Sequence, residues 1–163
     1  MLLFRLNMIS GEITGLFATT VGGVPKPSVD SIQVQSVGIK DEIIRDKKHH
    51  GGAEKAVCLL AQEIVDELRA SGHPIAGGTT GENILLNVPF SSLRPGVRLQ
   101  FPNVLLEITM AASPCKTIKE SFLNHNFSLL SNKKYPGKTR WYARVLVEGT
   151  IRQGENVIIN SDA

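Results

Sequence analysis

The sequence predicts a mostly β protein with a few helices, closed as a barrel rather than layered as a doubly wound sheet. Many short strand-like segments follow one another at close spacing, with turn residues between them. Only one segment has the length and apolar periodicity of a long helix. The chain has 163 residues, of which 42% are hydrophobic, so it can bury a core of its own. We therefore expect residues 1–163 to form a single domain.

The predicted strands are short apolar runs, and in several of them apolar and polar residues alternate. Turn residues separate them, as in "FPN" at 101–103 and "RQGEN" at 152–156. The segment "TTVGGVPKPS", Thr19–Ser28, predicts a surface loop. The strands are expected at Leu2–Met8, Ile13–Phe17, Ile32–Val37, Asn83–Val88, Val97–Phe101, Val104–Thr109, Ala143–Val147 and Asn156–Ile159.

A long amphipathic helix is predicted over Ala53–Ser71. Gly72 suits the position just after a helix, and Pro74 prevents the helix from continuing. A shorter helix is predicted over Lys116–Leu123. The apolar residues that recur at helical spacing in the long segment are Ala56, Val57, Leu60, Ile64, Val65 and Leu68.

Charge and cysteine content narrow the class of protein. The net charge of +3 permits an anionic partner but does not require nucleic acid. No run of about 18 apolar residues occurs, so we expect no membrane-spanning segment. The two cysteines, Cys58 and Cys115, have no CxxC spacing and indicate neither a disulfide framework nor a zinc site. A cytoplasmic location is the expectation.

The stretch "KKHHGGAEKAV", residues 47–57, places histidines, glycines and a lysine before the predicted helix. Glycines leave their N–H groups unshielded, and N–H groups at a helix start can hold an anion. His50, Gly51, Gly52 and Lys55 would then face that anion. The structural alternative, a tight turn with solvated cations, is equally compatible with these residues.

Two further stretches contain residue types that suit a binding site. In "TTGENILL", residues 79–86, Gly81 allows a sharp turn, and the Asn83 amide can recognise the edge of a heterocycle. Taken alone, a turn capped by its own side chains is the simpler interpretation. In "AASPCKTIKE", residues 111–120, Cys115 follows Pro114 at a predicted helix start, where the thiolate is favoured. Cys58, within the long predicted helix, is expected to be a buried, inert thiol.

The last stretch, "YPGKTRWYARVLVEG" at 135–149, mixes basic and aromatic residues. Such residues can stack on bases or bind phosphates. A barrel strand with inward aromatic side chains explains Trp141 better. The role of Arg144 stays open at this point.

In order, the segments "DKKHHGGAEKAV" (46–57), "GENI" (81–84), "PC" (114–115) and "RVLVEGTIRQGE" (144–155) resemble the MOSC domain family, named for the C-terminal domain of molybdenum cofactor sulfurases. The resemblance covers about residues 34–159. It implies a MOSC-type β-barrel with one cofactor pocket. The family often has an arginine shortly before its Pro-Cys pair, where this chain has Ala112 and Ser113, and many members have phenylalanine at the position of Thr80.

The resemblance also implies a cofactor and a function. Members that reduce amidoximes bind the molybdenum cofactor, molybdopterin, and by position Cys115 would ligate the molybdenum and carry the chemistry. The implied function is reduction of a small N-hydroxylated substrate, which requires an electron-donor protein. The residues expected to bind the cofactor are His50, Gly51, Gly52, Lys55, Gly81, Glu82, Asn83 and Arg144.

Two alternatives remain. The family has also been proposed to carry sulfur, so a Cys115 persulfide without bound metal, charged by a sulfur-donor protein, is the second hypothesis. A nucleic-acid-binding barrel is a distant third, because it gives Cys115 and the histidine-glycine stretch no purpose. Its contact residues would be Lys133, Lys134, Lys138, Arg140 and Trp141.

Overall fold

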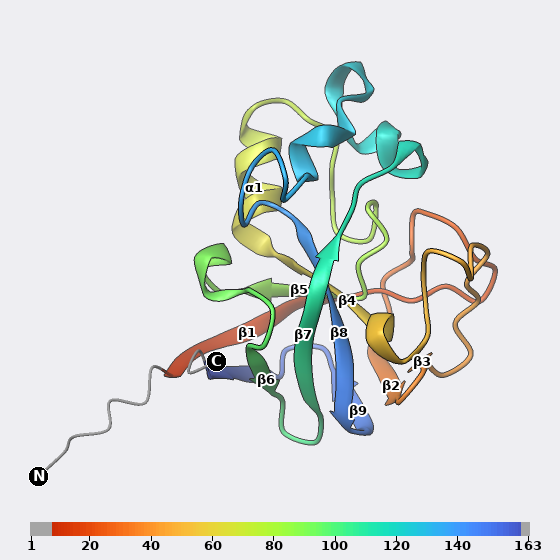
Figure 1. Cartoon of the computed structure of the whole chain (residues 1–163), viewed down its shortest axis with the longest axis vertical. Helices are drawn as coiled ribbons and strands as arrows, with labels where there is room; N and C mark the ends of the chain where they lie inside the picture. Colours follow the sequence, from red (N-terminus) through yellow and green to blue (C-terminus); the bar gives the residue numbers. More distant parts are fainter. Residues whose placement is uncertain (1–7, 161–163) are drawn as a thin grey trace, which may run out of the picture.

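The computed structural model describes residues 8–160 and contains a closed barrel of seven strands (Figure 1). Around the barrel the order is β1, β10, β6, β7, β8, β4, β5, and β5 pairs again with β1. The predicted barrel is thus confirmed. The strands are β1 (Met8–Leu16), β4 (Val57–Ala61), β5 (Ile84–Asn87), β6 (Arg98–Gln100), β7 (Leu105–Ala112), β8 (Arg140–Val147) and β10 (Asn156–Asn160).

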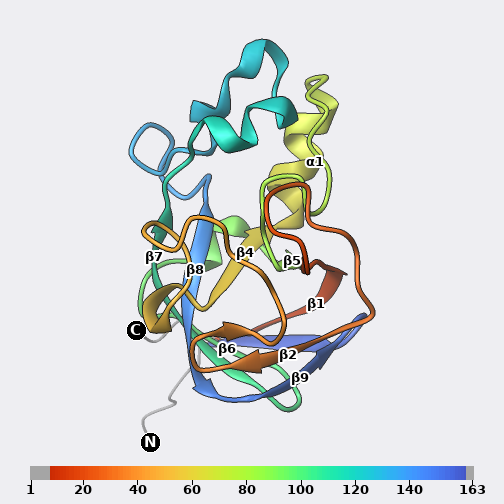
Figure 2. The same cartoon turned by 90° about the vertical axis from the view of Figure 1, so that its right-hand side faces the viewer.

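A second, three-stranded sheet lies against the lower part of the barrel in Figure 2. It consists of β2 (Ser31–Gln35), β3 (Gly38–Ile39) and β9 (Gly149–Arg152). The sequence analysis predicted β2 but neither β3 nor β9. The predicted strand Leu2–Met8 lies outside the described residues except for Met8.

The long predicted helix is wrong in its first half. Residues 53–55 form one 3-10 turn, η1 (Ala53–Lys55), then β4 follows, and the α-helix α1 spans only Gln62–Ala70. All five residues of β4 are buried, because β4 lies inside the barrel wall between β5 and β8. A continuous apolar run of this kind fits a fully buried strand as well as a helix. The helix end was predicted correctly, since Gly72 has φ +91°.

The strand β4, the helix α1 and the strand β5 form a β-α-β connection, and β4 and β5 are accordingly parallel. Every other strand pairing among residues 8–160 is antiparallel. Of the two predicted turns, 101–103 joins the antiparallel neighbours β6 and β7, and 152–156 connects β9 of the second sheet to β10 of the barrel. Phe101 N–H donates to the Val104 carbonyl at 2.9 Å in the first of them.

Short 3-10 helices lie with α1 above one end of the barrel (Figure 1). The predicted helix at 116–123 is one of these: it begins at Lys116 as expected but is a 3-10 helix and ends at Ser121. A different segment, residues 17–52, runs along the outside of β4 and β8 (Figure 2). The helix that begins at Lys116 is η3 (Lys116–Ser121). Besides η1 and η3, the 3-10 helices among residues 8–160 are η2 (Phe90–Ser92), η4 (Leu123–His125) and η5 (Phe127–Leu130).

Candidate functional site

A cavity of about 370 Å³ lies between the outer segment of residues 17–52 and the strands β4 and β8. The strands contribute Cys58 from β4 and Arg140 and Tyr142 from β8. Cys58 and Tyr142 are direct cross-strand partners, so the barrel wall fixes the floor of the cavity. The rest of the lining comes from the loops and turns around these strands: Gly23, Val24, Lys26, residues 42–46, His50, Gly51, Lys55, Ala56, Thr80, Gly81, Asn83, Thr117 and Ile118. A volume of this size suits a small organic ligand.

Positive charge dominates the lining. Four cationic side chains, Lys26, Arg45, Lys55 and Arg140, face two carboxylates, Glu42 and Asp46. Both carboxylates already have partners: Lys26 Nζ lies 3.0 Å from Glu42, and Asp46 accepts from His49. Arg45, Lys55 and Arg140 make no ion pair with any residue in the range 8–160; Arg45 and Lys55 donate instead to backbone carbonyls.

Arg140 is the most unusual of these cations, because it is buried without a carboxylate partner. Only 4% of the residue is exposed. Its Nη1 donates to the Thr80 carbonyl at 2.7 Å, and its Nη2 lies 3.3 and 3.4 Å from the carbonyls of Ser113 and Ala112. Its buried Nε has no hydrogen-bond partner among the described residues. A buried charge of this kind is costly unless an opposite charge comes close, so an anion in the cavity would stabilise it.

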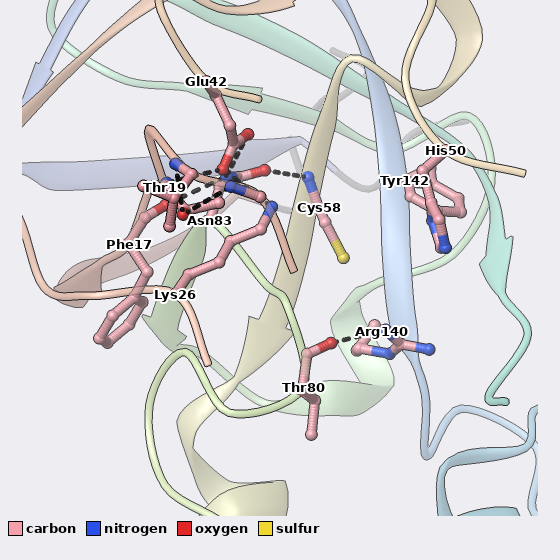
Figure 3. Close-up of polar contacts among 12 residues, drawn as sticks. Phe17, Thr19, Lys26, Glu42, His50, Cys58, Thr80, Asn83, Arg140 and Tyr142 are labelled. Atoms are coloured by element: carbon pink, nitrogen blue, oxygen red, sulfur yellow. Dashed lines mark hydrogen bonds and ion pairs between the residues drawn. The ribbon is translucent and has the colours of Figure 1, made fainter. Parts of the chain in front are cut away.

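Asn83 and Glu42 form a polar cluster at one side of the cavity (Figure 3). The Asn83 Oδ1 accepts from Cys58 N–H at 3.1 Å, and its Nδ2 donates to the Phe17 carbonyl at 3.1 Å and to Glu42. Glu42 also binds Lys26. The sequence analysis expected Asn83 to contact a ligand. The structure places it on the lining but shows its amide fully engaged in joining β4 to the end of β1.

His50 and Tyr142 form a close pair at the other side of the cavity (Figure 3). His50 Nδ1 and the Tyr142 hydroxyl form a short hydrogen bond, and Lys55 Nζ lies 5.5 Å from the centre of the Tyr142 ring. Burial, followed by the positive charge of Arg140, lowers the pKa of His50 below its ordinary value. The imidazole is therefore neutral at pH 7 while the cavity holds no anion.

The glycine stretch lies at the cavity, but not at the start of a long helix. Gly51 lines the cavity with φ +80°, and a Cβ there would lie 3.2 Å from Ile44. Gly52 precedes η1, which has only three residues, so the expected helix dipole is absent at this point. Gly52 also lies outside the lining. Gly81, with φ +82°, does line the cavity.

Two of the expected site residues lie outside the lining. Glu82 is fully buried and accepts from the Thr80 hydroxyl at 3.2 Å, and burial raises its pKa above the ordinary carboxyl value. Arg144 holds Glu54 in a two-point ion pair and also binds Glu107. It thereby fastens η1 to the barrel. A role for either residue in cofactor binding stays a prediction.

The two cysteines differ in place and in exposure. Cys58 is buried, as expected, although on a strand and not in a helix, and it lines the cavity. Burial raises the pKa of its thiol to about 11. Cys115 is partly exposed and directly precedes η3, as expected. Its Sγ lies 2.8 Å from the Thr117 hydroxyl, and Thr117 lines the cavity whereas Cys115 itself does not.

Sequence reasoning missed most of the charged lining. Lys26, Glu42 and Arg45 come from loops without a recognisable motif, so nothing local indicated them. Arg140 and Tyr142 stood in the basic-aromatic stretch, and their spacing of two in a strand could have indicated a shared face. Trp141 is buried, as expected, and with Arg140 buried too the nucleic-acid alternative loses two of its five contact residues.

No three residues among His, Cys, Asp and Glu lie close enough together within residues 8–160 to hold a metal ion. Over the same residues, no helix has the length and apolar character needed to cross a membrane.

We expect phosphate soaked into crystals to bind in the cavity between Arg140, Lys55 and Gly51, because two cations without ion pairs and a glycine without a side chain line the cavity there. In solution the same binding should raise the pKa of His50, since the anion offsets the positive charges that lower it. An NMR titration with and without phosphate measures this. Density confined to the Lys133–Lys138 run, with no change at His50, would contradict the prediction.

The fold and the cavity together define a small β-barrel protein with an electropositive ligand pocket. The family model of the MOSC domain matches residues 46–158, which is more than half of the chain. The protein therefore belongs to the MOSC domain family, a family associated with binding of the molybdenum cofactor.

Several solved structures share the fold of this chain. The YUAD protein from Bacillus subtilis has a TM-score of 0.75 at 16% identity, covering 96% of this chain and 99% of that one. YiiM from Geobacillus stearothermophilus has a TM-score of 0.63 at 22% identity, covering 93% and 74%. YiiM from Escherichia coli has a TM-score of 0.64 at 16% identity, covering 93% and 71%. A search of the curated proteins gave no significant match.

Proposed function

We propose that the cavity binds the molybdenum cofactor and that the protein is a reductase of small N-hydroxylated substrates with Cys115 as the protein ligand to molybdenum. The observation that carries the proposal is Arg140, a buried guanidinium on the cavity lining with no carboxylate partner among the described residues. The cofactor's phosphate would supply the missing negative charge.

The lining fits such a group in charge and in size. Lys55 and Arg45 stand at the cavity without ion pairs, and Gly51 and Gly81 keep the backbone free of side chains where a ligand would approach. Ala112 and Ser113 occupy the positions where the family often has an arginine. Arg140 Nη2 reaches the carbonyls of these same two residues. A positive charge thus stands beside the Pro-Cys pair in this chain too, but it comes from β8.

Cys115 suits the role of metal ligand by exposure and position. It is partly exposed and separated by one residue from Thr117 on the cavity lining. A thiolate is a soft ligand that favours a redox-active metal, and a cofactor that brings its own sulfur ligands requires few from the protein. When bound, the cofactor would supply the two-electron chemistry, while the chain binds, orients and protonates the substrate.

The proposed reaction requires an electron donor and a substrate. A reductase of this kind draws electrons from a separate redox protein, because the sequence contains no flavin or iron–sulfur motif. Its substrate is a small molecule, and we place the reaction in the cytoplasm. The sulfur-carrier alternative uses the same Cys115 as a persulfide loaded by a sulfur-donor protein.

The test is elemental analysis for molybdenum, with pterin detection, on protein made in a host that synthesises the cofactor. We expect molybdenum and pterin in equal amounts in the wild type. Arg140→Gln should bind the cofactor about 10–100-fold more weakly, because a charge-assisted hydrogen bond in a buried site contributes about 1.5–3 kcal/mol. Arg152→Gln, an exposed arginine on β9, is the matched control and should bind like the wild type.

Folding of both variants is checked by thermal melting, so that loss of cofactor is not mistaken for loss of structure. Persulfide on Cys115 with no molybdenum in the wild type would support the sulfur carrier instead. Equal cofactor content in Arg140→Gln and wild type would contradict the assigned phosphate site.

A further inference from the structure

A proton donor stands on the lining of the cavity. Tyr142 and His50 both line it, and the phenol hydroxyl is hydrogen-bonded to His50 Nδ1 (Figure 3). The phenol is held rigidly, since Tyr142 belongs to β8, which pairs with β4 on one side and with β7 on the other. A pair like this, with one hydroxyl directed to a ligand cavity and one imidazole behind it, is suited to proton delivery.

The surroundings keep the Tyr142 hydroxyl protonated and the His50 imidazole neutral, which are the forms that proton delivery requires. Burial raises the pKa of Tyr142 above the ordinary phenol value, so the hydroxyl stays protonated at physiological pH. The imidazole of His50 is neutral at pH 7, as its lowered pKa implies. With its proton on Nδ1, neutral His50 would donate to the phenol oxygen and leave the phenol proton free for a ligand, which is the arrangement that proton delivery requires. His50 is half-buried, so solvent can return a proton to its ring.

We propose that Tyr142 is the catalytic acid of the reduction and that His50 is the positioning residue that restores its proton. This inference rests on the proposed function. Reduction of an N-hydroxylated substrate breaks the N–O bond and consumes two electrons and two protons. The electrons come from the reduced redox protein by way of the cofactor.

The proton balance assigns one step to each group. Tyr142 gives its hydroxyl proton to the departing oxygen, which leaves as water. The proton on His50 Nδ1 then moves to the phenolate, and Nε2 takes a proton from solvent. Exchange of the ring proton with solvent, from Nε2 back to Nδ1, restores the starting tautomer. The second proton, which the product nitrogen needs, also comes from solvent. Each turnover thus converts one N–OH group, two electrons and two protons into N–H and water.

Tyr142→Phe tests the inference, because it removes only the hydroxyl oxygen. The chain has two tyrosines, and Tyr135, which is 44% exposed and outside the cavity lining, supplies the matched control Tyr135→Phe. Turnover is measured per molybdenum atom with an amidoxime and a chemical reductant. We expect Tyr142→Phe to retain cofactor but to lose about 10²–10⁴-fold in turnover, the usual contribution of a general acid. Tyr135→Phe should match the wild type.

Two readouts separate proton delivery from a structural role. The wild type should show a solvent deuterium isotope effect on turnover that Tyr142→Phe lacks. In cofactor-free protein, the ¹⁵N signal of His50 Nδ1 should shift in Tyr142→Phe and stay unchanged in Tyr135→Phe. His50→Gln should lose less turnover than Tyr142→Phe, because its amide can still donate to the phenol oxygen although it cannot pass a proton on.

Failure of the Tyr142 assignment can be distinguished from failure of the proposed function. Full cofactor content together with Tyr142→Phe turnover within about threefold of wild type overturns the assignment of Tyr142 alone, since a general acid contributes far more. Absence of molybdenum and pterin from the wild type overturns the proposed function, and the assignment with it. An unchanged ¹⁵N signal of His50 in Tyr142→Phe would likewise contradict the proposal that His50 and Tyr142 act as a hydrogen-bonded pair.

Discussion

Replacing Cys115 with serine is expected to remove molybdenum from the protein while leaving it folded. Serine is nearly isosteric with cysteine, and the side chain of residue 115 is partly exposed, so the barrel should tolerate the change. A hydroxyl is a far poorer ligand than a thiolate for a soft metal centre. Mutation of a residue that merely supports a metal ligand already lowers metal affinity about tenfold or more. Loss of the ligand itself should therefore reduce bound molybdenum at least tenfold, as measured by elemental analysis. Thermal melting provides the check on folding.

Cys58 is the matched control for Cys115, because the two thiols differ in burial and in position relative to the cavity. Cys58 lies on the lining, whereas Cys115 lies beside it. Burial raises the Cys58 pKa to about 11, so its thiol stays protonated at neutral pH and should react with a thiol probe only near or above pH 11. A probe at pH 7 should therefore label Cys115 first. Cys58→Ser should keep the metal and lose about 1–3 kcal/mol of unfolding free energy if its hydroxyl lacks a partner.

A reversed result would reassign the ligand. If Cys58→Ser lost molybdenum and Cys115→Ser kept it, the thiol on the barrel wall would be the metal ligand. If both variants kept full cofactor and turnover, neither cysteine would carry the chemistry. Both the reductase and the sulfur-carrier hypotheses would then fail, since each depends on Cys115.

The barrel could be predicted from the sequence because its strands show their own local signals. Alternating apolar residues and turn residues marked β2, β6, β7 and β10 to within a few residues. β4 could not be recognised, because a strand buried on both faces has no alternation, and its apolar residues continued those of α1 at helical spacing. Only its pairing with β5 and β8, which are distant in sequence, determines its conformation.

Five of the residues predicted for the site line the cavity: His50, Gly51, Lys55, Gly81 and Asn83. For His50, Gly51 and Lys55 the expected reason, the start of a long helix, was wrong. The remaining features depend on contacts between distant segments. The ion pair between Arg144 and Glu54 joins residues 90 positions apart, and Arg140 reaches carbonyls 27 to 60 positions away. No local pattern indicates which of two similar arginines will face the cavity.

Replacing Asn83 with leucine is expected to destabilise the protein more than any other single change proposed for the site. The side chain is 2% exposed, and leucine keeps its branching at Cγ but is larger, so lost hydrogen bonds and overpacking both contribute. The change leaves the Cys58 N–H without its acceptor and removes a donor from both the Phe17 carbonyl and Glu42. Glu42 keeps its ion pair with Lys26, so the Cys58 N–H and the Phe17 carbonyl are the two groups left unsatisfied. At about 1–3 kcal/mol for each, the lost hydrogen bonds lower the free energy of unfolding, measured by urea denaturation, by about 2–6 kcal/mol. Asn87→Leu changes an exposed asparagine at the end of β5, the strand that directly follows Asn83, and should change this free energy by less than about 0.5 kcal/mol. Equal stability of the two variants would show that solvent satisfies these groups and that Asn83 does not hold β4 to the end of β1.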